Sequence, residues 1–254
     1  MKLHLGSILT LLLLNSPFLS GLPLDDKPDD SSTVVERSPT ALQRRVVNGH
    51  VKLRWEHKDR PNAFWGHFGK PNFDDTPYLL PDNQRHDRSA IIAQSNHFAK
   101  QAYDYIRNSF PDFKPPSFLV AVVYVPDIGF YFGTKPPMGN FRGEDMISPI
   151  AATIAPHWKA ASYPRTEIRH LHSEDSALYT LEEFVGKHPS VLARWGARGN
   201  QPYRGSSYMA VYGYFNDGPV GIVRPCSLQT PNNPITCYTM LSALGVGSLV
   251  TEWT

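Results

Sequence analysis

Four residues in the second half of the chain have the types and the spacing of a catalytic zinc site. Glu174 follows His172 at the second position, and Pro225-Cys226 and then Cys237 come later in the chain. Zinc in a catalytic site takes three protein ligands and leaves one position open for water. One imidazole and two thiolates would supply that set. The pattern therefore predicts His172, Cys226 and Cys237 as metal ligands, with Glu174 as the proton carrier beside them.

The same cysteines allow a second interpretation. They are the only two cysteines of the chain, and in an exported protein such a pair commonly forms a disulfide. A Cys226–Cys237 disulfide would leave a non-enzymatic secreted protein whose exposed aromatic side chains bind a partner. The proline before Cys226 and the glutamate after His172 favour the zinc site. His170 is the alternative histidine, but only His172 has a glutamate two positions on.

Hydrophobic patterns predict the elements that must position these residues. Apolar residues recur at threes and fours after Asp87 or Ser89, which predicts a helix of about 20 residues. A second helix starts at His172 and Glu174, and a third starts at Cys237 with Thr236 as its cap. The expected strands cover residues 118–125, 130–134, 208–215, 220–223 and 248–253. Residues 135–165, which are rich in proline, are expected to form a long loop with a lid-like role.

The first part of the chain has the composition of a targeting segment. Residues 1–21 have a short basic start and an apolar run, as in a secretory signal peptide. Residues 22–45 are acidic and poor in large apolar side chains, which favours disorder. They end in Arg44-Arg45, which we interpret as a processing site, with an uncleaved tail as the alternative. No later stretch is long and apolar enough to span a membrane, so the sequence predicts a soluble secreted product.

Residues 46–87 contain many aromatic residues and prolines but no hydrophobic period. We interpret them as an irregular extension packed against a domain that covers residues 88–254. His57 and His67 match no ligand spacing and are interpreted as packing or surface residues.

Two further groups of side chains could contact a substrate. Aromatic residues can stack on bases, but ordinary core packing is favoured for Tyr208, Tyr212, Tyr214 and Trp195. Arg194, Arg198 and Arg204 form a loose basic cluster for which solvated surface charge is favoured. The net charge of +2 gives no support for a nucleic-acid groove. Substrate-binding residues are therefore not predicted.

The order of these elements and motifs resembles the zinc-dependent cytidine deaminase-like superfamily, which includes nucleoside, RNA, DNA and secreted toxin deaminases. His172 and Glu174 match the family's His-x-Glu on one core helix, and Pro225, Cys226 and Cys237 match its Pro-Cys…Cys at the next. The resemblance covers residues 88–254. It departs from the family at the cysteines, because the common Cys-x-x-Cys spacing is here widened by residues 227–236. It implies an α/β fold of three layers, a mixed sheet flanked by helices, with the irregular N-terminal extension outside it.

The resemblance also implies a reaction. Zn²⁺ would lower the pKa of a bound water, and Glu174 would take the water proton and deliver it to the ring nitrogen and the departing ammonia. The substrate would be a nucleobase, either free, in a nucleoside or in single-stranded nucleic acid. Together with the signal peptide, this predicts a secreted deaminase that acts as a toxin or effector.

Overall fold

The computed structural model describes residues 49–55, 62–70, 75–139, 141–162, 167–226 and 235–249. The predicted signal peptide, the acidic segment, the Arg44-Arg45 site and His57 lie outside these residues. The described residues all belong to one compact unit.

Strands and helices are interspersed along this unit. The strands are β1 (His50–Trp55), β2 (Phe64–Gly69), β3 (Phe118–Val125), β4 (Gly129–Thr134), β5 (Tyr208–Tyr214), β6 (Gly221–Ile222) and β7 (Gly247–Ser248). The α-helices are α1 (Arg88–Ser109), α2 (Phe141–Ile147), α3 (Ala151–Ile154), α4 (Pro156–Ser162), α5 (Ser173–Lys187), α6 (Pro189–Ala197) and α7 (Cys237–Leu244). A 3-10 helix, η1 (Ile168–His170), lies shortly before α5 in the chain.

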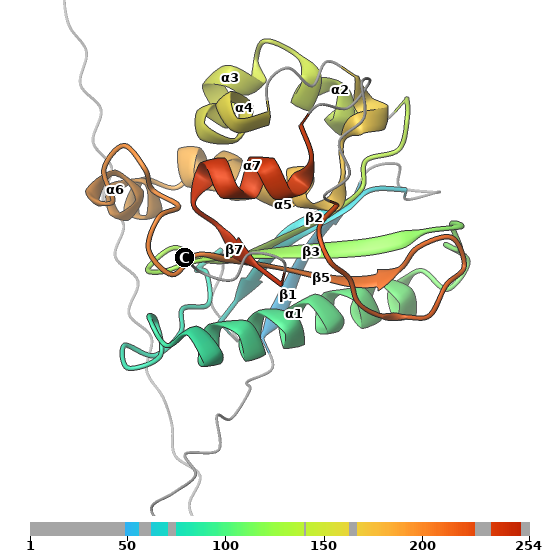
Figure 1. Cartoon of the computed structure of the whole chain (residues 1–254), viewed down its shortest axis with the longest axis horizontal. Helices are drawn as coiled ribbons and strands as arrows, with labels where there is room; N and C mark the ends of the chain where they lie inside the picture. Colours follow the sequence, from blue (N-terminus) through green and yellow to red (C-terminus); the bar gives the residue numbers. More distant parts are fainter. Residues whose placement is uncertain are drawn as a thin grey trace, which may run out of the picture. The chain divides into compact units, whose positions relative to one another are not determined.

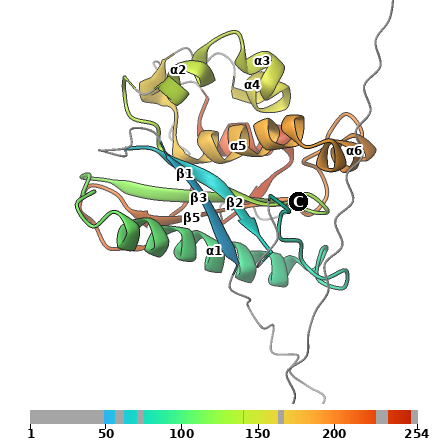
Figure 2. The same ribbon diagram turned by 180° about the vertical axis from the view of Figure 1, so that it is seen from behind.

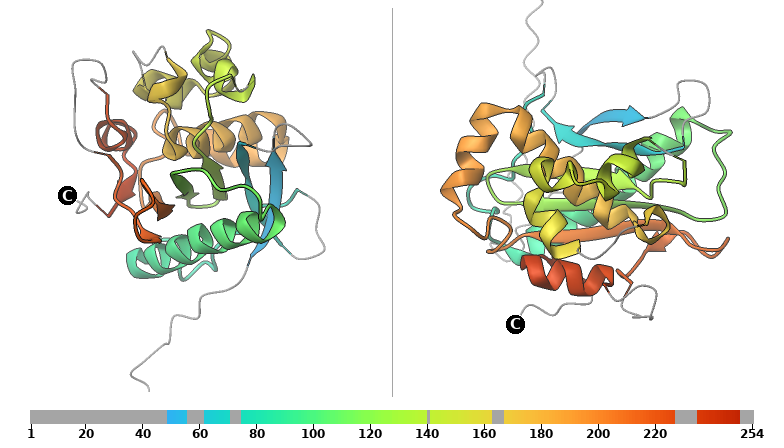
Figure 3. Two further views of the ribbon diagram at one scale, coloured as in Figure 1. Left: turned by 90° about the vertical axis from the view of Figure 1, so that its right-hand side faces the viewer. Right: turned by 90° about the horizontal axis from the view of Figure 1, so that it is seen from above.

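The strands form one sheet with helices on both faces. Its order is β1-β2-β4-β3-β5-β6 with antiparallel neighbours, and β7 pairs in parallel with β5. Helix α1 covers one face, while α5 and α7 lie on the other with α2, α3 and α4 farther out (Figures 1 and 2). Figure 3 gives two further views of this layering. The prediction of an α/β fold with a sheet flanked by helices is confirmed.

Strand β3 is buried on both faces because each face carries its own apolar cluster. Val120 and Val122 belong to the cluster beneath α1, and Ala121 and Val123 belong to the cluster beneath α5. Successive side chains of a strand point to opposite faces, so alternate residues of β3 serve the two cores. A central strand of this kind reads as a continuous apolar run, which is why the sequence identifies it well.

The expected irregular extension is wrong for residues 50–55 and 64–69. They form an antiparallel pair, β1 and β2, and β2 adds to the sheet through β4. Nearly all of β2 is buried, so it lacks the alternation of a half-exposed strand. A Cβ at Gly66 would meet the carbonyl oxygen of Lys52, so the glycine that weakens the strand pattern is what lets β1 approach.

The expected long loop is also wrong, because α2, α3 and α4 occupy most of residues 141–162. They span four to seven residues each, too few to establish a helical period. The predictions of α1, β3, β4, α5, β5 and α7 with its Thr236 cap are confirmed, and of the two possible starts of α1 it is Asp87 that caps the helix. Strand β6 is shorter than expected, at residues 221–222, and β7 covers residues 247–248. Residues 250–253 of the expected last strand lie outside the described residues. No helix among the described residues is long and apolar enough to cross a membrane.

Candidate active site

His172 and Glu174 lie at the start of α5, where the local sequence holds the backbone in place. His172 is the N-cap residue, and its backbone N–H donates to the carboxylate of Asp175 at 2.8 Å. Asp175 is fully buried and also accepts the indole N–H of Trp158 at 3.1 Å. An acidic side chain in the first turn also suits the helix dipole. Asp175 therefore connects the histidine backbone to the α4 layer.

Cys237 is the first residue of α7, and the start of this helix also holds Cys226. The Thr236 hydroxyl caps the helix by accepting the Thr239 N–H at 3.1 Å. The N–H of Cys237 donates to the sulfur of Cys226 at 3.3 Å, and the N–H of Tyr238 donates to the Cys226 carbonyl at 3.1 Å. Backbone N–H groups at a helix start stabilise a thiolate. Both sulfurs are thus collected at one helix terminus.

The three predicted ligands come together. The Nδ1 atom of His172 lies 3.1 Å from the sulfur of Cys237 and 3.3 Å from that of Cys226, and the three donor atoms lie within 4.8 Å of one another. At usual zinc bond lengths, tetrahedral ligands place nitrogen and sulfur about 3.6 Å apart. The spacing and the donor types of His172, Cys226 and Cys237 therefore fit a metal ion that accepts nitrogen and sulfur. Both cysteines are free thiols in the structure.

Burial and the hydrogen bonds among the three side chains shift the pKa of each member of the cluster. A hydrogen bond with Cys237 lowers the pKa of Cys226 to about 4, against the opposing effect of burial. Burial raises the pKa of Cys237 well above its usual range. Burial disfavours charge on His172, but the hydrogen bond with Cys226 and the nearby Glu174 outweigh it, so its pKa is raised. The site therefore favours the thiolate at Cys226, the protonated thiol at Cys237 and the charged form of His172.

Glu174 lies next to this cluster at the wall of a cavity. Its side chain is only 4% exposed, and one carboxylate oxygen accepts the Ser173 hydroxyl at 2.9 Å. Burial raises the pKa of this carboxyl. Glu174 lines a cavity of about 620 Å³ together with His172 and Cys226, while Cys237 is fully buried behind them. The arrangement can hold a ligand beside the three donor atoms and move a proton at the Glu174 carboxylate.

His170, the alternative ligand, lies in η1 and is not a member of the cluster. His67 is buried against Phe184, which confirms its interpretation as a packing residue. The predicted core packing of the aromatic residues is also confirmed. Tyr208, Tyr212 and Tyr214 belong to the cluster beneath α1, and Trp195 packs against Tyr203.

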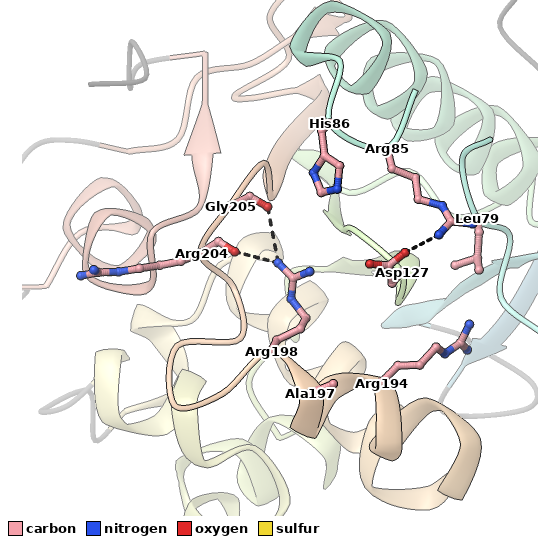
Figure 4. A pocket seen from close by; sticks show the side chains of 9 residues that line it. All are labelled: Leu79, Arg85, His86, Asp127, Arg194, Ala197, Arg198, Arg204 and Gly205. Atoms are coloured by element: carbon pink, nitrogen blue, oxygen red, sulfur yellow. Dashed lines mark hydrogen bonds and ion pairs between the residues drawn. The ribbon is translucent and has the colours of Figure 1, made fainter. Parts of the chain in front are cut away.

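The three arginines of the basic cluster line a different cavity, of about 590 Å³, near the turn that follows β3 (Figure 4). Arg198 donates to the carbonyl oxygens of Pro126, Pro202, Arg204 and Gly205, so its guanidinium ties these loops together and is not simply solvated. Arg85 at the same cavity pairs with Asp127. The local acceptors therefore give these two arginines a structural role.

Sequence reasoning missed Asp175 as the residue that fixes His172, and Lys135, Phe215 and Arg224 at the cavity. The available signals were that Lys135 directly follows a predicted strand and that Arg224 precedes Pro225-Cys226.

Searches of protein families, of curated proteins and of solved structures found no match to this chain.

Proposed function

We propose that the protein is a zinc-dependent deaminase that hydrolyses the exocyclic amine of a nucleobase. One observation carries this proposal: His172, Cys226 and Cys237 gather their donor atoms within 4.8 Å, beside the buried Glu174 and at the wall of a large cavity. The resemblance of these residues to the cytidine deaminase-like superfamily supplies the reaction class. A sheet that contains a parallel pair and carries helices on both faces supports the three-layer fold implied by that resemblance.

His172, Cys226 and Cys237 would hold the metal. Zinc with an open position supplies Lewis-acid chemistry and lowers the pKa of water there. The Glu174 carboxylate would carry the two protons of the attacking water in turn, the first to the ring nitrogen and the second to the departing amine, so that water and the amino base give the oxo base and ammonia. Asp175 keeps the His172 backbone in place. The apolar walls at Leu119, Val211 and Val223 would exclude bulk water from the base.

The metal proposal is tested on the purified protein by metal analysis with a count of free thiols. We expect close to one equivalent of zinc, and a Cys226→Ala variant should lose it because one of three protein ligands is gone. Exposed Tyr105 gives a matched control, and Tyr105→Ala should keep the metal. A stoichiometric disulfide with no bound metal would contradict the proposal and favour the non-enzymatic interaction protein.

The proton-transfer role is tested with Glu174→Gln, which removes the proton carrier but keeps the side-chain shape. The variant should retain zinc and lose ammonia release from a panel of nucleobases, nucleosides and oligonucleotides, by about 100-fold or more. Glu144 is exposed on α2, so Glu144→Gln is the control that should keep full activity. Retained activity in Glu174→Gln would show that another group moves the proton.

The predicted signal peptide and dibasic site motivate the further proposal that the enzyme is secreted and acts as a toxin or effector on other cells. Detection of the chain in the culture medium, with a new terminus at Val46, is the expected result.

A further inference from the structure

The mouth of the cavity beside Glu174 is positively charged. Lys135, directly after β4, and Arg224, shortly after β6, line it, and both side chains are exposed. Within the described part of the chain neither forms an ion pair with a carboxylate. Among the described residues that line the cavity, the acidic group is Glu174, which is buried next to the proposed metal ligands, and Asp217 on the nearby turn does not line the cavity. Two cations at a site entrance attract an anionic ligand.

An aromatic side chain is held at the same mouth. Phe215 lines the cavity and is 62% exposed, an unusual environment for a phenyl ring in a defined turn. The turn that follows it places Asn216 and Asp217 in the left-handed region, with φ of 49° and 55°, and the Gly218 N–H donates to the Phe215 carbonyl at 3.0 Å. Asparagine and aspartate tolerate this conformation better than most residues. The turn is therefore a defined structure.

The start of β3 anchors this turn from the other side. The N–H of Asn216 donates to the Ser117 hydroxyl at 2.8 Å, and the N–H of Asp217 donates to the Pro116 carbonyl at 2.9 Å. Because these bonds tie the turn to the central strand, Phe215 is positioned at the cavity before any ligand arrives. An exposed aromatic face of this kind can stack on any nucleobase.

The size and chemistry of the cavity indicate more than a single ring. Its volume of about 620 Å³ lies in the range of sites that hold whole small-molecule ligands. The apolar walls suit a base, while Lys135 and Arg224 have no partner in an uncharged nucleoside. Lysine and arginine bind phosphate through charge-assisted hydrogen bonds. A base that carries a phosphate satisfies all these groups at once.

We infer that this cavity selects a phosphate-bearing substrate, a nucleotide unit, with Lys135 and Arg224 contacting the phosphate and Phe215 stacking on the base. The inference rests on the proposed function, because it names the substrate class of the same site. A mononucleotide and a single strand of nucleic acid present the same phosphate chemistry.

The test is a binding measurement that needs no turnover. Zinc-loaded Glu174→Gln protein is titrated by calorimetry with cytidine, cytidine 5′-monophosphate and a short single-stranded oligonucleotide that contains cytosine, and the adenine series is run in parallel. Metal-stripped wild-type protein serves as a second inactive form in case the variant misfolds. For at least one base, the nucleotide should bind about tenfold or more tightly than the nucleoside, and this preference should weaken as salt rises. Oligonucleotide binding tighter than that of the mononucleotide would identify a nucleic-acid strand as the source of the phosphate.

A matched pair of double variants assigns the preference to this site. Lys135→Ala/Arg224→Ala should reduce nucleotide affinity to that of the nucleoside. Arg54→Ala/Lys70→Ala makes the same charge change at exposed positions of the β1–β2 edge, at the far side of the sheet, and should leave the preference intact. Phe215→Ala should weaken the binding of nucleoside and nucleotide alike, because stacking acts on the base.

Equal affinity for nucleoside and nucleotide, or a preference that survives in Lys135→Ala/Arg224→Ala, would overturn the inference. Efficient ammonia release from free nucleosides, with no tighter binding of nucleotides, would overturn this inference but leave the deaminase proposal standing. Protein that contains no metal and releases no ammonia, yet binds nucleotides through Lys135 and Arg224, would overturn the deaminase proposal alone.

Discussion

Glu182 is a buried carboxyl in the middle of α5 whose protonation couples stability to pH. It accepts the backbone N–H groups of His157 and Trp158 at 3.0 and 2.7 Å and the Tyr203 hydroxyl at 2.9 Å. Burial raises the pKa of Glu182 from 4.5 to about 7, although these hydrogen bonds act in the opposite direction. The folded protein therefore keeps a proton on Glu182 at pH values where the unfolded chain has released it.

This raised pKa gives a prediction with a definite sign. The stabilisation by the proton on Glu182 is complete below about pH 4.5 and is lost as pH rises to about 7, by up to about 3 kcal/mol. His67 works the other way, because burial lowers its pKa from 6.5 to about 4. Urea unfolding of wild type and Glu182→Gln across this range isolates Glu182, since His67 is common to both. As pH rises, the free energy of unfolding of wild type should fall relative to that of Glu182→Gln. A difference that stays constant with pH would contradict the raised pKa of Glu182.

At the scale of residues, the cluster of His172, Cys226 and Cys237 could be predicted, because histidine, cysteine and a nearby glutamate at defined offsets are residue types that carry chemistry. Lys135 and Arg224 could not, because lysine and arginine are common on every surface. Their place at the cavity depends on the sheet, which brings the segments after β4 and β6 to one cavity although β3 and β5 lie between these strands. Residue type alone can identify a site when few residue types carry the chemistry. Common charged residues are recognised as part of a site only from their position in the folded protein.

At the scale of elements, the site helix α5 lies directly on β4 because Gly133 has no side chain. A Cβ at Gly133 would come within 2.7 Å of the Ser176 backbone and 2.5 Å of its hydroxyl oxygen. Ser176 is in the first turn of α5, close to His172 and Glu174. Close packing here fixes the height of the start of α5 above the sheet.

We therefore expect Gly133→Ala to destabilise the protein by about 1–3 kcal/mol and to weaken zinc retention, because the start of α5 must move away from β4. Gly186, which lies on α5 itself, is the control, since its added Cβ would meet nothing within 4 Å. Gly186→Ala should be neutral or stabilise by up to about 1 kcal/mol. Thermal unfolding and metal analysis of both variants provide the measurement. If Gly133→Ala behaved like Gly186→Ala, α5 would not depend on this contact for its position.

Elements with one clear period or a continuous buried run, such as α1, α5 and β3, were predictable from the sequence. The β1–β2 pair and helices α2 to α4 were not. Their residues are buried by neighbours distant in the chain, as when Trp158 of α4 packs against Tyr179 of α5. Short elements have too few residues to display a period, so tertiary contacts determine them.

At the scale of the whole molecule, the apolar clusters of the described residues run from Val51 to Val246. The first residue of these clusters, Val51, follows the predicted dibasic site. A chain that begins at Val46 should therefore unfold cooperatively at the same temperature as the full chain, within about 2 °C, and bind the same amount of zinc. Differential scanning calorimetry of both forms makes the comparison. A large loss of stability in the shorter chain would show that the preceding residues are needed for the folded state.

The anchored turn at Phe215 has a consequence for how this protein can evolve. Its conformation depends on backbone hydrogen bonds to Ser117 and Pro116, whereas the Phe215 side chain packs in neither apolar cluster of the described residues. Replacement of that side chain therefore changes what the cavity mouth presents without disturbing either core. Under the proposed function, selection can alter substrate preference at this position while the fold stays constant.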